Sequence, residues 1–134
     1  MLNSDIINAA LKEIYVLADE ETPTARQSAD ALNMLNRMMA QWAIEDKDIN
    51  FPPQDTLGAT APIPMWAEDA VITNLALYLN PQFKGSITQE LYDRAVKSRA
   101  RVAANLINTK LDNTDMSHMP QGDSNSRWDI ETDT

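Results

Sequence analysis

Neighbouring carboxylates are the residues of this chain that come nearest to a catalytic arrangement. The pairs Glu20–Glu21 and Glu68–Asp69 are examples. Glycoside hydrolysis uses two carboxyl groups about 5–10 Å apart across a cleft, one of them with a raised pKa. Both pairs lie where a helix is expected to begin, however, and the helix macrodipole stabilises acids at that end. We therefore interpret them as solvated acids, with a carboxylate-dependent cell-wall hydrolase as the enzymatic alternative.

The other residue types exclude much of the remaining chemistry. The chain has no cysteine, which rules out disulfides and thiolate catalysis. Its single histidine, His118, makes a multi-histidine metal site impossible and argues against a histidine-based triad. No Gly-rich phosphate loop is present. The sequence thus predicts no catalytic residue, no metal and no cofactor.

Basic residues concentrate in the segment 87–111. Arg94, Lys97 and Arg101 follow one another at i, i+3 and i+7, so they share one face of a helix. Three interpretations are open: the phosphate-binding stripe of a small DNA-binding regulator, a solvated face, and a surface that meets acids of a neighbouring subunit. The net charge of −9 disfavours the first, because such a chain repels nucleic acid. We assign these three residues to contacts between subunits.

The elements that must position these residues are helices. Apolar residues recur at spacings of three and four, and three glycines with few aromatic residues argue against a β fold. The fold class is therefore all-α, a four-helix domain over 1–111 with a long proline-containing middle loop, followed by an extended C-terminal tail over 112–134. The expected helices are 4–19, 24–46, 65–80 and 87–111. No apolar run approaches the ~20 residues that span a bilayer, so no membrane partner is expected.

Local signals indicate where these helices begin and end. Ser, Thr and Asp cap helix starts, and a Glu or Gln three residues later completes a capping box. A residue before proline leaves helical geometry. Before the first helix the signal is Ser4 or Asp5. Before the second it is a Thr24–Gln27 box, and a cap at Thr22 with Pro23 in the first turn is equally allowed. An Asn80–Pro81 stop follows the third helix, and a Ser86–Gln89 box precedes the fourth.

The helix 24–46 has the widest apolar stripe. Leu32, Leu35 and Trp42 lie on one face of it. Met34 and Met38 widen that stripe beyond the needs of one core contact. We expect these two methionines to contact another subunit.

The segment 46–64 has four prolines, one glycine and no sustained periodicity. So long a connection without secondary structure is uncommon in a compact domain and is usually functional. We expect it to touch a neighbouring subunit through Phe51 and Ile63, with a plain surface loop as the alternative.

The last segment, 112–134, is polar and acidic and cannot bury enough apolar surface to order by itself. It nevertheless carries spaced apolar residues. We expect this segment to order on a partner, with each apolar side chain filling a pocket, and a disordered tail with an incidental tryptophan is the alternative. The expected partner-binding residues are Met116, His118, Met119, Pro120, Trp128 and Ile130.

These residues together resemble the head-to-tail adaptor proteins of tailed bacteriophages. Such proteins begin with an aliphatic-x-x-A-L-x-x-aliphatic-x-V-L helix, an acidic linker and a helix with an A-L-x-x-L-N-x-M core followed by tryptophan. The matching residues are Ala10, Leu11, Ile14, Val16, Leu17, Ala31, Leu32, Leu35, Asn36, Met38 and Trp42. Asn74-Leu75-Ala76 before Pro81 matches a third element, and Met119-Pro120-Gln121-Gly122 is similar to the tail accessory factor, or packaged DNA stabilisation protein, of Salmonella-type short-tailed phages. Many adaptors have glycine where Tyr15 stands here.

The resemblance implies a structural virion protein of the neck or tail, assembled in the host cytoplasm. It implies a homo-oligomeric ring of twelve copies beneath the portal protein, joining capsid to tail and helping to retain packaged DNA. The helical body forms the ring and meets a downstream tail or nozzle protein, while the C-terminal tail clasps the portal. A net-negative lining lets double-stranded DNA pass without sequence-specific binding. A virion-borne hydrolase and a DNA-binding regulator are the alternatives.

Overall fold

A computed structural model describes residues 1–113 of the chain, with side chains over 1–107. The elements are α1 (Asn3–Glu13), α2 (Ala25–Glu45), a 3-10 turn η1 (Met65–Ala67), α3 (Glu68–Phe83) and α4 (Gln89–Asn113). The described residues contain no strand, which confirms the all-α class. The chain divides into two compact units, Met1–Ala104 and Asn105–Thr134, and the core belongs to the first.

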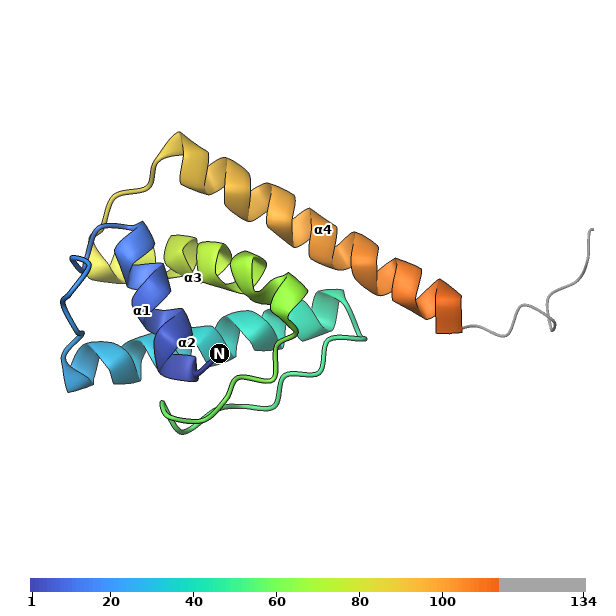
Figure 1. Ribbon diagram of the computed structural model, residues 1–134, viewed down its shortest axis with the longest axis horizontal. Helices are drawn as coiled ribbons and strands as arrows, with labels where there is room; N and C mark the ends of the chain where they lie inside the picture. Colours follow the sequence, from blue (N-terminus) through green and yellow to red (C-terminus); the bar gives the residue numbers. More distant parts are fainter. Residues whose placement is uncertain (114–134) are drawn as a thin grey trace, which may run out of the picture. The chain divides into compact units, whose positions relative to one another are not determined.

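The core lies where α1, α2 and α3 pack on one another (Figure 1). Each helix contributes a stripe of apolar side chains at spacings of three and four, as the sequence predicts. Fully buried large side chains include Ile6, Ile7, Leu11, Ile14, Leu35, Val71, Leu75 and Leu79. Burial of one such side chain contributes roughly 1.5–3 kcal/mol. These buried apolar side chains are therefore the main source of the folding stability of the subunit.

The helix α2 matches its prediction closely. The Thr24 hydroxyl accepts a hydrogen bond from the Gln27 N–H at 3.1 Å, and the Gln27 amide oxygen accepts from the Thr24 N–H at 2.9 Å. This reciprocal pair satisfies two of the N–H groups that a helix start leaves without partners. The other end stops at Asp46, whose backbone is extended.

The helix α1 is shorter than predicted, since it ends at Glu13 rather than at residue 19. Tyr15 has a left-handed backbone, with φ of 63°. Its N–H donates to the Lys12 carbonyl, and the Val16 N–H donates to the Leu11 carbonyl. These two bonds form a Schellman motif, which terminates a helix by satisfying its last carbonyl groups.

The start of α1 also differs, because neither Ser4 nor Asp5 is its N-cap. The helix begins at Asn3, and the Asp5 carboxylate reaches back to accept from the Leu2 N–H at 3.1 Å. The first helical N–H groups find partners elsewhere in the chain. Asn3 N–H donates to the Ala59 carbonyl and Ser4 N–H to the Leu57 carbonyl, both at 3.0 Å.

The helix α3 continues past its predicted stop, with Pro81 inside its last turn. A proline so near the end removes one backbone hydrogen bond, at a site where the helix is about to finish. The Lys84 N–H then donates to the Asn80 carbonyl at 2.8 Å, and Lys84 adopts a left-handed backbone with φ of 55°. That turn closes the helix at Phe83.

The start of α4 is capped by Thr88 instead of Ser86. The Thr88 hydroxyl accepts from the Leu91 N–H at 3.1 Å, whereas the Ser86 N–H donates to the Ile14 carbonyl at 2.9 Å. Ser86 is therefore used to attach the α3–α4 connection to the end of α1. The helix runs to Asn113, slightly beyond the predicted end at residue 111.

The portion of α4 up to Ala104 packs on α3 through small side chains. Ala95 and Ser98 are buried, and the Ser98 hydroxyl lies 3.2 Å from that of Thr73. The Asn74 amide donates to the Ala95 carbonyl at 3.0 Å. Leu91 and Val102 are buried on the same side, as the helical spacing predicts. This contact fixes which face of α4 is left for other molecules.

Candidate interaction surfaces

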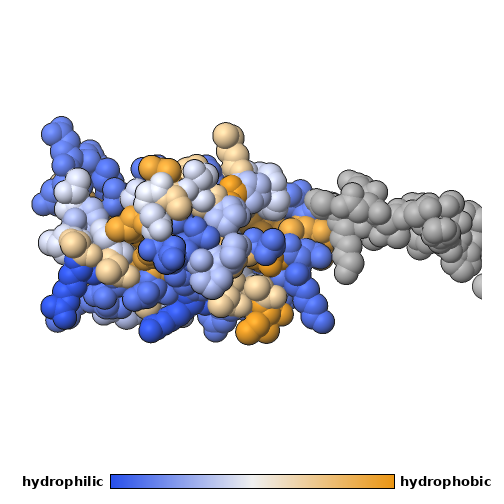
Figure 2. Space-filling view, turned by 90° about the horizontal axis from the view of Figure 1, so that it is seen from below, coloured by the Kyte–Doolittle hydropathy of each residue, from blue (hydrophilic) through white to orange (hydrophobic). Residues whose placement is uncertain are grey.

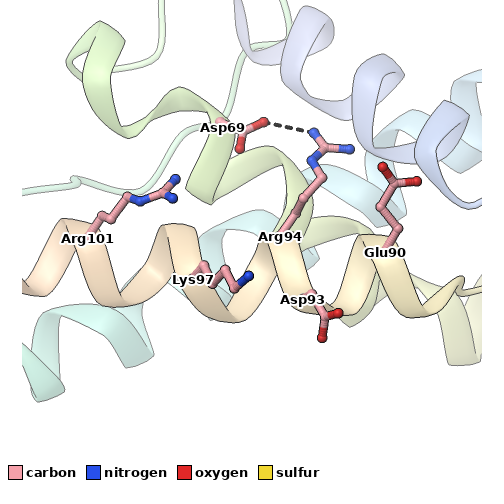
Figure 3. Close-up of a pocket in the computed structure, with 6 residues that line it drawn as sticks. All are labelled: Asp69, Glu90, Asp93, Arg94, Lys97 and Arg101. Atoms are coloured by element: carbon pink, nitrogen blue, oxygen red, sulfur yellow. Dashed lines mark hydrogen bonds and ion pairs between the residues drawn. The ribbon is translucent and has the colours of Figure 1, made fainter.

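The predicted basic stripe forms one wall of an open hollow of about 430 Å³. Figure 3 shows Arg94 and Arg101 extending from α4 on the side of Asp69, with Lys97 lying along α4 between them. Glu90 also lines this hollow. The prediction that the three basic residues share a face is confirmed, and the hollow has charges of both signs.

Arg94 is engaged within the subunit. Its guanidinium donates to both carboxylate oxygens of Glu13, at 3.3 and 3.1 Å, and to Asp69 at 3.0 Å. The hydrogen bond to Glu13, with a further one to Asp69, raises the pKa of Arg94 above its ordinary value. Because its side chain is 42% exposed, we discount these pairs to about 0–1 kcal/mol. They orient α4 against α1 and α3.

Lys97 and Arg101 make no ion pair with any side chain of residues 1–107, the range over which side chains are described. Both side chains are exposed. They are therefore the part of the stripe that is available to another molecule. The role of all three bases between subunits stays a prediction, and Arg94 has an established use inside the chain.

Arg99 is a structural residue that sequence reasoning did not single out. Its guanidinium stacks 4.3 Å from the centre of the Trp42 ring and donates to Glu45 at 2.9 Å and Asp46 at 2.8 Å. Its side chain is only 18% exposed, so the pairs are less screened than those of Arg94. The three partners of Arg99 lie together at the end of α2. They are more than 50 positions away in the sequence, so only the folded structure shows that Arg99 contacts them.

The two methionines that were expected to face another subunit differ from each other. Met38 is 3% exposed and packs in the subunit's own core. Its contact with another subunit stays a prediction, with little side-chain surface left to make it. The apolar stripe of α2 is wide because α3 covers this side of it as well. Met34 is partly exposed and remains the candidate for an outside contact.

A shallow groove of about 290 Å³ lies between α2 and α3. Its lining residues are Met38, Gln41, Trp42, Glu45, Asn74, Leu77 and Tyr78. Met38 reaches the surface only as part of this lining. In a space-filling view of one face, hydrophobic residues form separate small groups within a hydrophilic surface (Figure 2).

The middle loop is attached to the body by side-chain amides. The Asn36 amide donates to the Gln54 carbonyl at 2.7 Å, and its oxygen accepts from the Gln54 N–H at 2.8 Å. The buried Asn3 amide donates to the Gln54 side chain at 3.1 Å and to the Thr56 carbonyl at 2.9 Å. The loop therefore supplies the cap that α1 lacks, and it is more than a plain surface connection.

Phe51 and Ile63, the two expected apolar anchors of this loop, are each partly buried against the same subunit. Their proposed contact with a neighbouring subunit stays a prediction. The sequence signal for the attachment of the loop was a set of three amide side chains, Asn3, Asn36 and Gln54, of which only Gln54 belongs to the loop.

The carboxylate pairs lie in exposed or already paired positions. Glu20 and Glu21 are exposed, and the Glu21 carboxylate accepts from the Ala18 N–H at 2.7 Å. Asp69 pairs with Arg94, and its side chain is largely exposed. Glu68 lies 4.0 Å from the N-terminal ammonium of Met1, and Asp69 lines the open hollow beside α4. The acids of both pairs lie beside helix starts, where the macrodipole stabilises them.

The described residues have neither the ligand cluster of a metal site nor a helix suited to a membrane. No group of three or more acids or histidines within residues 1–113 is arranged to hold a metal ion. None of the helices there combines the length and apolar character needed to cross a membrane. The predicted portal-binding residues, Met116, His118, Met119, Pro120, Trp128 and Ile130, lie outside the described residues.

The fold and these surfaces define an all-α protein whose described residues present contact surfaces without an enclosed polar site. The family model of the P22 tail accessory factor matches residues 1–133, and the chain belongs to this family. The protein is thus a structural virion component of a tailed bacteriophage, and the predicted resemblance is confirmed. No curated protein matches the chain.

Proposed function

We propose that the protein assembles as a ring of twelve copies beneath the phage portal, where it joins capsid to tail. The observation that carries this proposal is the family match, which spans almost the whole chain. The ring would extend the DNA channel, help to retain packaged DNA and offer a platform to a downstream tail or nozzle protein. Assembly would take place in the host cytoplasm and end in the virion neck.

The chain divides this work between a body and a tail. The body has its own core and contact surfaces, including the exposed bases Lys97 and Arg101. The segment after Asn113 carries the predicted portal contacts, among them Trp128 and Ile130. Repetition around a ring converts weak single contacts into high avidity.

The charge of the chain suits a conduit for DNA. A net charge of −9 gives each subunit a repulsive interaction with phosphate, so duplex DNA would slide past without being held. Double-stranded DNA is accordingly a passing molecule here, with no sequence-specific binding expected.

The test is electron microscopy of the full chain mixed with isolated portal rings from the same phage. We expect an added twelve-fold layer on the portal. A chain cut after Asn113, which keeps α4 whole, should leave portal rings bare. The pair Trp128→Ala and Ile130→Ala should weaken binding, with Ser124→Ala as the matched control.

Two results would count against the proposal. Full-length protein that leaves portals undecorated would overturn the ring beneath the portal. A truncated chain that decorates portals as well as the full chain would overturn the role of the C-terminal segment while leaving the ring intact.

A further inference from the structure

Tyr15 combines two unfavourable features in the free subunit. Its backbone is left-handed, with φ of 63°, a conformation that costs a residue with a side chain about 1–2 kcal/mol. Its ring is 70% exposed to solvent. A strained backbone and an exposed aromatic ring at the same residue indicate that another molecule buries the Tyr15 ring.

Acidic side chains follow Tyr15 in the same connection. Asp19 and Glu20 are both exposed, and neither pairs with a base in the described part of the chain. Tyr15, Asp19 and Glu20 together form what we name the knob surface. It offers one aromatic ring and two free carboxylates.

A second surface has the complementary chemistry. Met65 is 85% exposed and Trp66 is 51% exposed on the turn η1, which leads directly into α3. Asp69 is four residues after Met65 and three after Trp66, so it lies on the same side of the helix as these two residues. Asp69 also lines the hollow that holds Lys97 and Arg101.

We name Met65, Trp66, Lys97 and Arg101 the receiving surface. Exposed Met1 and Leu2 extend its apolar part, because the Ala61 N–H donates to the Met1 carbonyl and Leu2 bridges Thr60. Large apolar side chains that are left exposed in neighbouring segments are candidates for an interaction site.

The two surfaces lie at opposite ends of α3. Tyr15 adjoins the C-terminal end, because the carbonyl of Ile14 accepts from the N–H of Ser86. The receiving surface adjoins the N-terminal end through η1. The Arg94 guanidinium joins Glu13 to Asp69, but Asp19 and Glu20 form no ion pair with Lys97 or Arg101 in the described part of the chain. The two surfaces therefore do not pair with each other within one subunit.

We propose that the knob surface of one copy binds the receiving surface of the next copy. The Tyr15 ring packs on Met65 and Trp66, where sulfur–aromatic and aromatic contacts are favourable. Asp19 and Glu20 pair with Lys97 and Arg101. This inference rests on the proposed ring, because two different faces in contact give a heterologous interface, which closes into a ring when the rotation per subunit allows.

The absence of cysteine from the chain allows a direct test. Full-length protein carrying both Tyr15→Cys and Trp66→Cys is bound to portal rings and oxidised. Disulfides between neighbouring copies should give a ladder of covalent multimers on a denaturing gel. The control pairs Tyr15→Cys with Ile44→Cys, since Ile44 is an exposed apolar residue on α2 outside both surfaces.

Charge reversal supplies an independent measurement. Asp19→Lys with Glu20→Lys should weaken subunit association about tenfold or more, and Lys97→Glu with Arg101→Glu should do the same. One chain carrying all four changes should recover association, because the reversed surfaces are again complementary. The matched control, Arg37→Glu with Lys47→Glu, changes two exposed bases outside the stripe and should have no comparable effect.

The outcomes separate this contact from the proposed function. Decorated portals without a ladder in the Tyr15→Cys/Trp66→Cys protein, or without rescue in the four-fold variant, would overturn the contact and leave the ring standing. If portals stay undecorated, the proposed ring beneath the portal is wrong. The contact between the knob and receiving surfaces is then tested by oxidising the free Tyr15→Cys/Trp66→Cys protein at high concentration. A ladder of covalent multimers in that sample supports the contact, and monomers alone overturn it.

Discussion

The two connections before α3 differ in a way that their sequences do not suggest. The middle loop, 46–64, is the longer and is rich in proline, yet amides from α1 and α2 hold its backbone at several points. The connection between α1 and α2, 14–24, is shorter and has the exposed, strained Tyr15. The length of a connection is therefore a poor guide to whether it is free to contact another molecule. The groups that its backbone hydrogen-bonds to are a better guide.

Each connection also begins beside an arginine of α4. Arg99 braces Glu45 and Asp46, where the middle loop starts, and is mostly buried against Trp42. Arg94 braces Glu13, where the first connection starts, and is largely exposed. The middle loop is thus part of the folded body. The first connection is attached to the body at its start, and its exposed residues remain available for contact with another molecule.

The largest expected effect is from Asn36→Ala, which removes both hydrogen bonds to the Gln54 backbone. We expect a loss of about 2–3 kcal/mol in the free energy of unfolding, because a partly buried N–H and C=O lose their partners. Urea unfolding measures it. The exposed Asn33→Ala on the same helix is the control and should be neutral or slightly stabilising. Equal effects of the two changes would show that the loop is not held in this way.

The next effect compares a glycine beside each connection. A Cβ at Gly85 would lie 2.5 Å from the Ile14 carbonyl oxygen and 2.8 Å from the Ile14 Cβ, whereas one at Gly58 meets nothing within 4 Å. Gly85→Ala should therefore cost about 1–3 kcal/mol by forcing the α3–α4 connection off α1. Gly58→Ala should be tolerated. Thermal unfolding of both variants tests this, and a tolerated Gly85→Ala would contradict the close approach at Ile14.

The two arginines should differ in the same direction. Arg99→Ala should lower stability by about 1–2 kcal/mol, since it removes a shielded ion pair and the stacking on Trp42. Arg94→Ala should cost roughly 0.5 kcal/mol, because its pairs are screened by solvent. Measurement at low and high salt sharpens the contrast, with the Arg94 effect fading first. Similar losses for both would remove the distinction between the two connections.

The smallest effect has the opposite sign. Tyr15→Gly should raise the free energy of unfolding of the subunit by about 0.5–1 kcal/mol, because glycine adopts the left-handed backbone without strain and loses part of that gain through its unfolded-state entropy. Chemical denaturation of monomeric protein measures this change. A destabilised Tyr15→Gly variant would mean that the ring contributes to the fold of its own subunit.

The candidate surfaces were predicted from sequence only in part. The helical period placed Arg94, Lys97 and Arg101 on one face, but their spacing could not show that Arg94 is taken up by Glu13 and Asp69. It could not connect Arg99 with the end of α2 either. The burial of Met38 in the subunit's own core could not be predicted either, because a wide apolar stripe looks the same whether α3 or another subunit covers it.

The sequence by itself determined the all-α class and the limits of α2, because these follow from helical periodicity and from hydrogen bonds that span three residues, such as the Thr24–Gln27 capping box. Only the tertiary structure decided where α1 begins and ends. Its start depends on loop carbonyls more than 50 positions away, and its end on a Tyr15 turn whose neighbour Ile14 is bound by Ser86. Such partners are brought together by packing, and local propensity has no information about them.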